Sequence, residues 1–554
     1  MISTTVDPVR AAEYRSAGFW GDASLHDYWR LAVLSAPERE AVVDARGKRL
    51  TYAQVDNLAA RLAGHLRDAG VRRGDVVSVQ LPNWAEFLVV DVACLKLGAV
   101  VNPMLPQHRS REMSYRLNAC GSTALVMATQ FRSMDYRELA AQLVEAHAAV
   151  RAVLMVENGG VASGGITSFD EAARHDPLAE QAWEPGRGTD VAAVLFTSGS
   201  EALPKGVMLS HNNVLAGERA FAYELNLGQI DRLFMPAPIG HATGYLHGLT
   251  MPYVVGGTSV LLDVFTGPSA AAMMDAERCT WGMGATSIIS DLFDACEQSG
   301  ATLRGVRSLC CGGAPVPRRL LERARQFGTR LHSVYGSTES APHTLTRRDD
   351  SDEVALRTDG RPVTGTQIKV VDPKTRRSVP PGVEGEEASR GPAVFLGYLC
   401  DPELTARAID ADGWYYSGDL AVLDEAGNLR ITGRIKDVIV RGGENISANE
   451  IEDIIREHPS VKDVAVVSMP NERLGECACA CIVPSLNGEP PLDLVGLREF
   501  FVERGVAKYK IPERIEILDQ LPTTPSGKVR KGDLRTWIAG RVAAERAAGS
   551  VAAH

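Results

Sequence analysis

A run of small, hydroxylated and basic residues from Thr197 to Gly206 is the part of this sequence best suited to chemistry. It follows Val191–Phe196, a short apolar run typical of a buried strand. Glycine and serine free backbone N–H groups to surround an anion, hydroxyls add donors, and Lys205 adds positive charge. A P-loop NTPase requires Ser or Thr directly after the lysine, but Lys205 is followed by Gly206. Taken alone, the residues fit a phosphate-binding loop and a Ser/Gly-rich linker equally well.

Further short motifs follow this loop in a fixed order. They are Pro238–Gly244 (PIGHATG), Gly312–Pro315 (GGAP), Tyr335–Glu339 (YGSTE), Gly413–Asp419 (GWYYSGD), Gly433–Asp437 (GRIKD) and Pro525–Lys528 (PSGK). Together with the loop they resemble the adenylate-forming superfamily of acyl-CoA ligases, luciferases and peptide-synthetase adenylation domains, over roughly residues 20 to 540. The run Ala242–His247 (ATGYLH) and the turn Arg441–Asn445 (RGGEN) look closest to cyclohexanecarboxylate- and medium-chain acyl-CoA ligases.

The resemblance implies an enzyme that makes an acyl-adenylate from a carboxylic acid and ATP, and then transfers the acyl group to the thiol of CoA. It implies nucleotide-binding roles for Thr197, Ser198, Gly199, Ser200, Lys205, Gly313, Ala314, Pro315, Tyr335, Gly336, Asp419 and Arg434. Asp419 would accept hydrogen bonds from both ribose hydroxyls, because a carboxylate offers only acceptors. The alternative is an ordinary turn aspartate after glycine.

The same resemblance implies catalytic roles for Lys528, His241, Thr338 and Glu339. Lys528 would bridge the substrate carboxylate and the α-phosphate, where a cation offsets developing charge. Thr338 would bind the α-phosphate, and Glu339 would bind Mg²⁺, which prefers hard oxygen ligands. His241 would be the gate of the thiol tunnel. For Lys528 the alternative is an ordinary Ser-Gly-Lys turn. For Glu339 it is an acidic residue in the first turn of a helix, and for His241 it is a structural histidine.

A second group of residues would act after adenylation, when the C-terminal domain is expected to rotate. Lys436 would be the hinge, and Gly442, Gly443 and Glu444 would line the thiol tunnel, where glycine lets a pantetheine arm pass close to the backbone. An exposed lysine in a linker is the alternative for the hinge. Ala242 and Gly312 would shape the acyl pocket. Ala242 offers no partner to an amine or a 2-hydroxyl group, so an uncharged acyl chain or an alicyclic or aryl acid is expected.

The loop departs from the family pattern at Glu201 and Ala202, where Thr-Gly is usual. One extra negative charge about 4 Å from a phosphate oxygen costs roughly 4 kcal/mol at an effective dielectric of 20, or about a thousandfold in affinity. An acyl-adenylate has lost its β- and γ-phosphates and escapes this cost. We hypothesise that the ATP half-reaction is impaired, so that a separate adenylating enzyme supplies the acyl-adenylate. The alternative is a tolerated variant, with Glu201 turned away or bridged by Mg²⁺.

Other functions stay open at this level. Luciferase-type oxygenases share every motif named above, and a carrier protein could replace CoA as acceptor. The motifs also leave open whether the chain forms a dimer. A binding protein without catalysis does not explain why both the ribose and the tunnel motifs are present.

Alternating strand and helix patterns must position these motifs. Thr51–Gly70 and Phe87–Leu97 have helical spacing, and Asp75–Leu81 between them reads as a strand, which predicts a layered α/β architecture. Residues 1–434 are expected to form a large N-terminal domain that binds adenylate and acyl group, and residues 435–554 a small, mobile α+β C-terminal domain. Val156–Gly188 is expected to be a loosely structured connection.

In the small domain, a helix is predicted over Leu494–Glu503 with Asp493 as its N-cap. A frayed, alanine-rich helix is expected from Ala539 to the end of the chain. The ten cysteines do not suggest a disulfide framework. Cys477, Cys479 and Cys481 alternate with alanine, as on one face of a strand, and no neighbouring ligands complete a metal site.

Composition limits the classes of partner. A chain of 554 residues is too long to fold around one hydrophobic core, so at least two domains are expected. The net charge of −10 argues against general nucleic-acid binding. The N-terminus has no apolar stretch typical of a secretory signal, so a cytoplasmic location is expected. The most apolar stretch, Phe87–Leu105, contains Asp91 and Lys96 and is interpreted as buried helix and strand, not as a membrane span.

Overall fold

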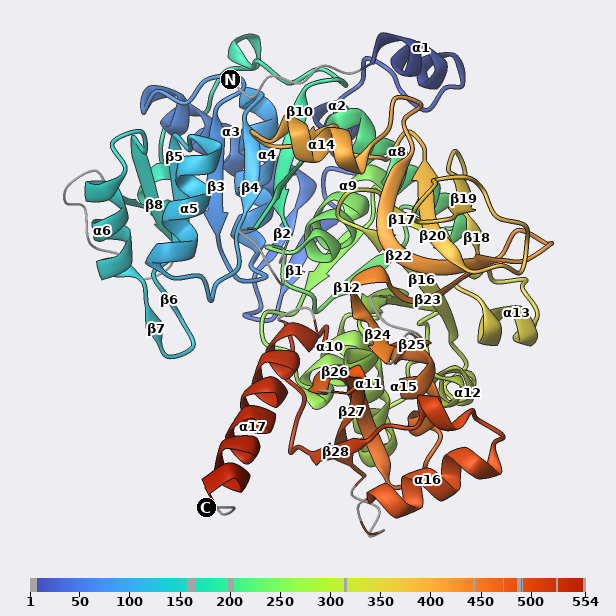
Figure 1. The fold of residues 1–554 in the computed structure, drawn as a ribbon. Helices are drawn as coiled ribbons and strands as arrows, with labels where there is room; N and C mark the ends of the chain where they lie inside the picture. The colour runs from blue at the N-terminus through green and yellow to red at the C-terminus, as the bar shows by residue number, and fades with distance from the viewer. Residues whose placement is uncertain are drawn as a thin grey trace.

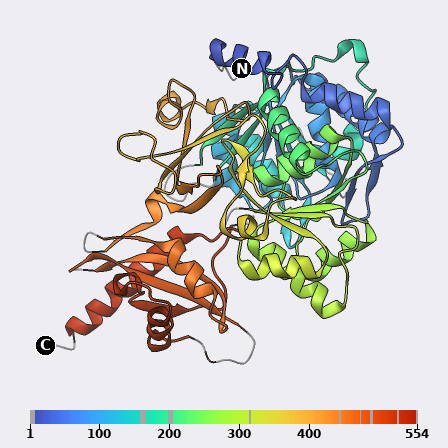
Figure 2. The same cartoon turned by 90° about the vertical axis from the view of Figure 1, so that its right-hand side faces the viewer.

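The computed structural model describes residues 7–156, 166–197, 204–312, 316–441, 444–471, 473–485, 490, 492–524 and 527–551. Figure 1 shows a large part, coloured from blue to orange, and a smaller part, coloured from orange to red, beside it. Figure 2 shows the two parts meeting along one side. The predicted α/β class, with a large N-terminal and a small C-terminal domain, is confirmed.

The first sheet of the large part is parallel in its centre. In spatial order it contains β18 (Arg361–Pro362), β17 (Ala341–Leu345), β16 (Arg330–Ser337), β15 (Ser308–Gly312), β14 (Trp281–Gly284), β12 (Arg232–Met235), β13 (Thr258–Leu261), β1 (Glu40–Asp44) and β2 (Arg49–Thr51). The parallel strands are joined through α9 (Met251–Val255), α10 (Gly267–Ala276), α11 (Thr286–Ser299) and α12 (Arg318–Gln326). Such crossover helices are what parallel pairing requires.

The second sheet contains the two strands that flank the loop Thr197–Gly206. Its order is β21 (Gly397–Tyr398), β11 (Gly206–Ser210), β10 (Val191–Phe196), β4 (Val100–Pro103), β3 (Val76–Gln80), β5 (Ala124–Ala128), β8 (Ala152–Val156) and β9 (Ile166–Ser168). Its helices are α2 (Leu25–Ser35), α3 (Tyr52–Asp68), α4 (Ala85–Leu97), α5 (Ser110–Cys120), α6 (Arg137–Ala146), α7 (Phe169–Ala172) and α8 (His211–Glu224), and α1 (Pro8–Ser16) precedes them. Between β5 and α6, β6 (Gln130–Phe131) and β7 (Met134–Asp135) form a small hairpin.

The third sheet and the small part follow in sequence. The third sheet contains β19 (Gln367–Val371), β20 (Gly385–Arg390), β22 (Tyr415–Leu423) and β23 (Leu429–Arg434), with α14 (Pro402–Ala408) between β21 and β22 and α13 (Asp352–Arg357) before β18. The short helix η3 (Ile435–Asp437) then leads into the small part. That part contains β25 (Glu444–Ser447), β24 (Val438–Arg441), β27 (Gly475–Pro484), β26 (Val461–Asn471) and β28 (Arg514–Ile517), with α15 (Ala448–Arg456), α16 (Leu494–Glu503) and α17 (Lys531–Val551).

The main core lies around α4, which is buried along its whole length. The charged residues that interrupt this apolar stretch are paired: Lys96 lies 2.7 Å from Asp56, and Asp91 accepts a hydrogen bond from the hydroxyl of Tyr245 at 3.1 Å. The interpretation as a buried helix and strand is therefore correct. No helix in the described part of the chain is both long and apolar enough to cross a membrane.

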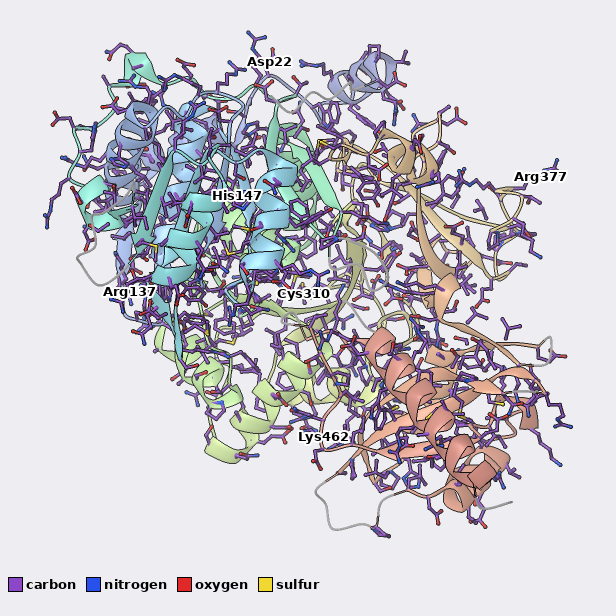
Figure 3. The ribbon with its side chains drawn as sticks, turned by 60° about the vertical axis from the view of Figure 1, so that its left-hand side comes forward. Asp22, Arg137, His147, Cys310, Arg377 and Lys462 are labelled. Carbon is purple, nitrogen blue, oxygen red and sulfur yellow. The ribbon has the colours of Figure 1, made fainter. Side chains whose placement is uncertain are left out.

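The cysteines are packed as the alternation predicts. Cys310 and Cys311 belong to two different hydrophobic clusters, on opposite faces of β15, and Cys310 lies inside the large part (Figure 3). Cys479 and Cys481 pack against Leu534 of α17, whereas the intervening alanines face the other cluster. Among the described residues no group of metal-ligating side chains gathers around them.

Two expectations need correction. The final helix begins at Lys531, not Ala539, because Leu534 and Ile538 supply an apolar face that packs on the sheet of the small part. The connection from Val156 to Gly188 is more ordered than its composition suggests, since Ile166–Ser168 adds a parallel strand to β8. The Asp493 N-cap is confirmed, with its carboxylate accepting a hydrogen bond from the Gly496 N–H at 2.8 Å.

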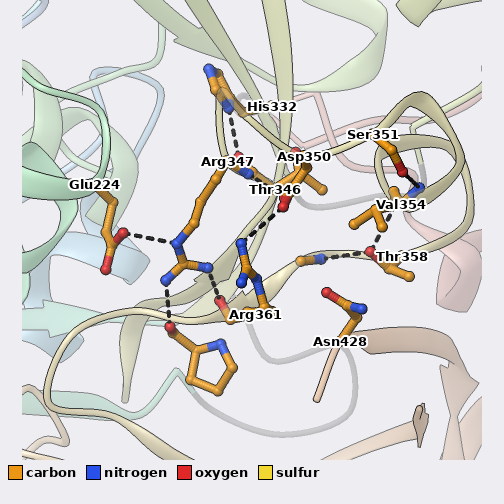
Figure 4. Close-up of polar contacts among 12 residues, drawn as sticks. Glu224, His332, Thr346, Arg347, Asp350, Ser351, Val354, Thr358, Arg361 and Asn428 are labelled. Carbon is orange, nitrogen blue, oxygen red and sulfur yellow. Dashed lines mark hydrogen bonds and ion pairs between the residues drawn. The ribbon is translucent and has the colours of Figure 1, made fainter. Parts of the chain in front are cut away.

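Arg347 connects the edge of the first sheet to a neighbouring helix (Figure 4). Its Nε lies 2.9 Å from Glu224 of α8, and its guanidinium donates to the carbonyl oxygen of Pro362 at 2.8 Å. These contacts hold β17 and β18 against α8. The turn that carries Thr338 and Glu339 immediately precedes β17 and is therefore anchored on that side.

Candidate active site

A cavity of about 90 Å³ lies between the large part and one loop of the small part. It is lined by segments that are far apart in sequence: the region of η2 (Gly244–Thr250, a π-helix) and the ends of β14, β15 and β16. It brings together six of the predicted residues: His241, Ala242, Gly312, Gly336, Thr338 and Lys528. A larger cleft of about 800 Å³ lies around α1, β21 and α14 and contains none of the predicted site residues.

Lys528 reaches this cavity from the small part because its loop runs very close to α11. Gly527 has a φ of +84°, and a Cβ there would lie 3.0 Å from Ser287 Oγ. The Lys528 N–H donates to the Thr524 hydroxyl at 3.1 Å, and its carbonyl accepts from the Thr524 N–H at 2.7 Å. Burial and the nearby cation of Arg434 lower the pKa of Lys528, while Asp419 and Glu339 oppose that shift. The amine therefore lies where an anion would stabilise its charge.

His241 lies on the same cavity wall, at the start of the segment that leads into η2. Desolvation, with a smaller contribution from Lys528, lowers its pKa from 6.5 to about 3. Its Nδ1 accepts a hydrogen bond from the Thr243 N–H at 3.3 Å. The imidazole is therefore neutral at physiological pH.

Asp419 is held rigidly beside the cavity. β22 and β23 pair so that Asp419 lies opposite Arg434, with Arg434 Nε 3.0 Å from Asp419 Oδ1. The hydroxyl of Tyr335 donates to Asp419 Oδ2 at 2.8 Å and lies 3.4 Å from Glu387. The carboxylate of Asp419 raises the pKa of Arg434. This arrangement holds the Asp419 carboxyl group in one position, where its oxygens suit a pair of ribose hydroxyls as acceptors.

Glu339 lies in the turn between β16 and β17 and is almost fully buried. The hydroxyl of Tyr398 donates to its Oε1 at 2.9 Å, and the Lys205 ammonium lies 5.3 Å from the centre of that tyrosine ring. In the described part of the chain, no cluster of three ligating side chains could hold a metal on its own. A single carboxylate such as that of Glu339 still suits Mg²⁺, because that ion usually takes one or two carboxylates together with phosphates and water.

Only the two ends of the phosphate loop are described. Phe196 pairs with Gly206, and the Thr197 N–H donates to the Lys205 carbonyl at 3.0 Å, so the loop connects two antiparallel strands. The hydroxyl of Tyr115 donates to the Pro204 carbonyl at 2.9 Å. Ser198, Gly199, Ser200, Glu201 and Ala202 lie outside the described residues, as do Gly313, Ala314 and Pro315 of the adenine motif. At the described C-terminal end of the loop, Lys205 lies beside Tyr398, whose hydroxyl contacts Glu339.

Two residues predicted for the second step, Glu444 and Lys436, do not line the cavity. Glu444 begins β25, is exposed, and does not line the cavity. Lys436 lies in η3, between the last strand of the large part and the first strand of the small part. Gly442 and Gly443 lie outside the described residues. Among the described residues, the cavity therefore contains Thr338 and Lys528, which were predicted for adenylation, and His241, which was predicted as the gate of the tunnel.

Sequence reasoning missed several residues that contact this site. Leu246, His247 and Met283 line the cavity, and Tyr398 holds Glu339. Leu246 and His247 follow Ala242 and Thr243 by four residues each, so helical spacing could have placed them on the same face. Tyr398 carries no such signal, because it meets Glu339 only through the fold.

Comparison with known proteins agrees with this geometry. The family described as AMP-binding enzyme matches residues 30–399, and the AMP-binding enzyme C-terminal domain matches residues 450–528. The medium-chain fatty-acid–CoA ligase of Escherichia coli (strain K12) is 45% identical over 98% of this chain and 95% of its own length. The salicyl-AMP ligase / salicyl-S-ArCP synthetase of Mycobacterium tuberculosis (strain ATCC 25618 / H37Rv) is 32% identical, over 94% of this chain and 92% of its own.

A solved structure shares the fold. The anthranilate CoA ligase AuaEII in complex with anthranoyl-AMP has a TM-score of 0.84 at 22% identity, over 94% of this chain and 98% of that one. The chain belongs to the AMP-binding enzyme family, and the resemblance to adenylate-forming enzymes is confirmed. The predicted class of enzyme, an acid–thiol ligase of the acyl-CoA synthetase type, is confirmed with it.

Proposed function

We propose that this chain converts a carboxylic acid with an uncharged acyl group to its CoA thioester through an acyl-adenylate. The observation that carries this function is the position of Lys528, which enters the same cavity as Thr338 and His241 from a separate part of the chain. The identity of 45% with a medium-chain fatty-acid–CoA ligase supports the same reaction and an aliphatic or alicyclic acid. Ala242, which offers no polar partner, lines the cavity and agrees with an uncharged acyl group.

In the first half-reaction, the substrate carboxylate would attack the α-phosphorus of ATP, and pyrophosphate would leave. Lys528 would hold the carboxylate and the α-phosphate together and offset the charge that develops between them. Asp419, fixed by Arg434 and Tyr335, would hold the ribose. Glu339 would hold Mg²⁺, which screens the phosphate charge when bound.

In the second half-reaction, the thiol sulfur of CoA would bond to the acyl carbon, and the bond from that carbon to the AMP oxygen would break. We propose that the small domain, residues 435–554, rotates about Lys436 between the two steps. This motion would withdraw Lys528 and bring Gly442, Gly443 and Glu444 to the tunnel. The neutral state of His241 supports its role as a gate, because a charged ring would be harder to move through a buried passage.

Within this function, we propose that the ATP-dependent half-reaction is the weaker one. The motivating feature is Glu201–Ala202 in the sequence of the phosphate loop, and the described end of that loop at Lys205 lies beside Tyr398. A carboxylate near the β- or γ-phosphate opposes ATP by roughly 4 kcal/mol and leaves an acyl-adenylate unaffected. A separate adenylating enzyme would then supply the substrate. The competing candidate, a ligase equally competent in both steps, is favoured by the retained Lys528.

Comparing the rate of turnover from ATP with the rate from acyl-adenylate decides between an impaired ATP half-reaction and a fully competent ligase. The purified protein is mixed with acid, ATP, Mg²⁺ and CoA, and separately with the synthetic acyl-adenylate and CoA. We expect the acyl-adenylate to be consumed at least about 100-fold faster. The double variant Glu201→Thr/Ala202→Gly should narrow this ratio by raising the ATP-dependent rate. Equal rates in the wild type, or no change in the ratio in the variant, would establish the fully competent ligase instead.

A carrier protein is the competing acceptor, favoured by the relative from M. tuberculosis whose name includes a carrier-bound product. Acyl transfer to free CoA and to a carrier carrying labelled phosphopantetheine should be measured at equal thiol concentration. CoA should react faster. Oxygen uptake or light emission with the acyl-adenylate would point to the luciferase-type alternative.

A further inference from the structure

A buried polar pair forms part of the wall of the acyl cavity. His247, on η2, lines the cavity together with Leu246 and Ala242. Its Nδ1 lies 2.8 Å from Oε2 of Glu218, which comes from α8. The side chains of His247 and Glu218 are only 3% and 0% exposed. An acyl pocket made for a plain hydrocarbon gains nothing from such a pair, since apolar side chains of similar size are as stable or more so.

The pair leaves hydrogen-bonding capacity unused. A carboxylate only accepts, so the hydrogen of the His247–Glu218 bond belongs to Nδ1, and Nε2 is the free edge of the ring. Among the described residues, Nε2 has no hydrogen-bond partner, and neither has the buried Oε1 of Glu218. Phe221 packs on the ring at 4.9 Å between centroids and limits its rotation. The imidazole therefore presents a fixed polar edge in the cavity wall.

The chemistry of the pair selects the group that would bind there. Nε2 accepts a hydrogen bond if the ring is neutral and donates one if the ring is charged. The net charge of the pair is negative or zero in these two states, so it does not attract a second carboxylate. A ketone can bind only the charged ring. A hydroxyl group donates and accepts, and so it fits both states.

The position of the pair limits where that hydroxyl lies. His247 follows His241 by six residues, and the π-helical turn that begins at Gly244 separates them along the cavity wall. His241 and Lys528 mark the end of the cavity where the carboxyl group reacts. A group that meets His247 is therefore several carbons from the reacting carboxyl.

We propose that the acid used by this enzyme carries a hydroxyl group several carbons from its carboxyl group, and that His247, positioned by Glu218, binds this hydroxyl. The inference rests on the proposed acyl-CoA ligase function and narrows its substrate. An unsubstituted chain would leave Nε2 buried without a partner, which is the kind of loss that sites of this type use to reject a substrate.

The test uses the full chain with synthetic acyl-adenylates and CoA. Straight-chain acids of about six to ten carbons are compared with matched derivatives that carry one hydroxyl, or one oxo group, at successive positions. For at least one position we expect the hydroxy derivative to exceed its parent in kcat/KM by about 10- to 100-fold, mostly through KM. The oxo derivative at that position should gain less.

Two variants separate recognition from packing. His247→Phe keeps a ring and removes both nitrogens, so the ratio of hydroxy derivative to parent should fall to about one. Glu218→Gln keeps an acceptor for Nδ1 and should retain most of the ratio. If His247→Phe does not fold, binding of a non-hydrolysable hydroxyacyl-adenylate analogue to the wild type, against its unsubstituted parent, gives the same comparison by calorimetry.

Parent chains that react as well as every hydroxy derivative in the wild type would overturn the proposal, and so would a ratio unchanged by His247→Phe. If no acyl-adenylate yields a thioester while the protein remains folded, the proposed function fails first and the inference fails with it. Rapid turnover of parent chains alone overturns the inference and leaves the proposed function standing.

Discussion

The buried polar groups at the two ends of this site, Asp419 at the proposed nucleotide end and the pair His247–Glu218 at the proposed acyl end, differ in how completely they are hydrogen-bonded. At the nucleotide end, both oxygens of Asp419 are occupied, one by Arg434 and one by Tyr335. At the acyl end, His247 and Glu218 are paired with each other but retain a free edge. The fully hydrogen-bonded carboxylate agrees with the proposed binding of an invariant ribose, and the incomplete pair agrees with the proposed binding of a substrate hydroxyl.

Removing the tied carboxylate should give the largest effect. We expect Asp419→Ala to lower kcat/KM by about 1,000-fold in both half-reactions, because two charge-assisted hydrogen bonds to the ribose are lost. Turnover of ATP with acid, and of acyl-adenylate with CoA, measures this. A loss confined to the ATP reaction would show that Asp419 does not hold the part of the nucleotide common to both substrates.

The next largest effect should separate the two half-reactions. Lys528→Ala should lower adenylation by about 100- to 1,000-fold, the usual effect of removing one electrostatic contact to a transition state. Transfer from the acyl-adenylate to CoA should change little, since the lysine would be withdrawn in that step. Lys528→Arg serves as the matched variant that keeps the charge. Equal losses in both steps would contradict the proposed rotation.

A smaller effect should follow from removing one hydrogen bond to Asp419 while its carboxyl group is kept. Tyr335→Phe deletes the hydroxyl that donates to Asp419 Oδ2 and leaves the ring in place. One hydrogen bond is worth about 1 kcal/mol, so kcat/KM should fall about fivefold in both half-reactions. An unchanged kcat/KM would mean that Arg434 alone positions the carboxylate.

The smallest effect concerns stability at the gate. The folded-state pKa of His241 is about 3, below its ordinary value of 6.5, so the unfolded chain binds a proton that the folded one does not. Stability is therefore complete above pH 6.5 and is lost as the pH falls from there toward 3. His241→Gln should be less sensitive to pH by about 1 kcal/mol between pH 6.5 and 5, as measured by urea unfolding. Identical pH dependence in the two proteins would show that the ring is not protected from protonation.

Much of this arrangement was predictable from sequence because its signals are local. The strand Val191–Phe196 and the helix Leu494–Glu503 are marked by periodicity and by the Asp493 cap. The ordered motifs predicted the residues that line the cavity, from His241 to Lys528. Each of these depends on neighbours within a few positions, or on a pattern shared across a family.

The contacts that fix those residues were not predictable, since they join segments distant in sequence. Tyr398 meets Glu339 across 59 residues, and Glu218 meets His247 across 29. The early start of α17 likewise depends on a sheet face that only the fold supplies. Local patterns identify the reacting groups, and tertiary packing decides what holds them.

We propose that the site favours an acyl-adenylate and disfavours a triphosphate. Isothermal calorimetry should compare the affinity of the wild type for ATP with Mg²⁺ and for a non-hydrolysable acyl-adenylate analogue, and then repeat both with Glu201→Thr/Ala202→Gly. The account predicts that the double variant gains up to about a thousandfold in ATP affinity while the affinity for the analogue changes little. ATP affinity that is equal in the two proteins would contradict it.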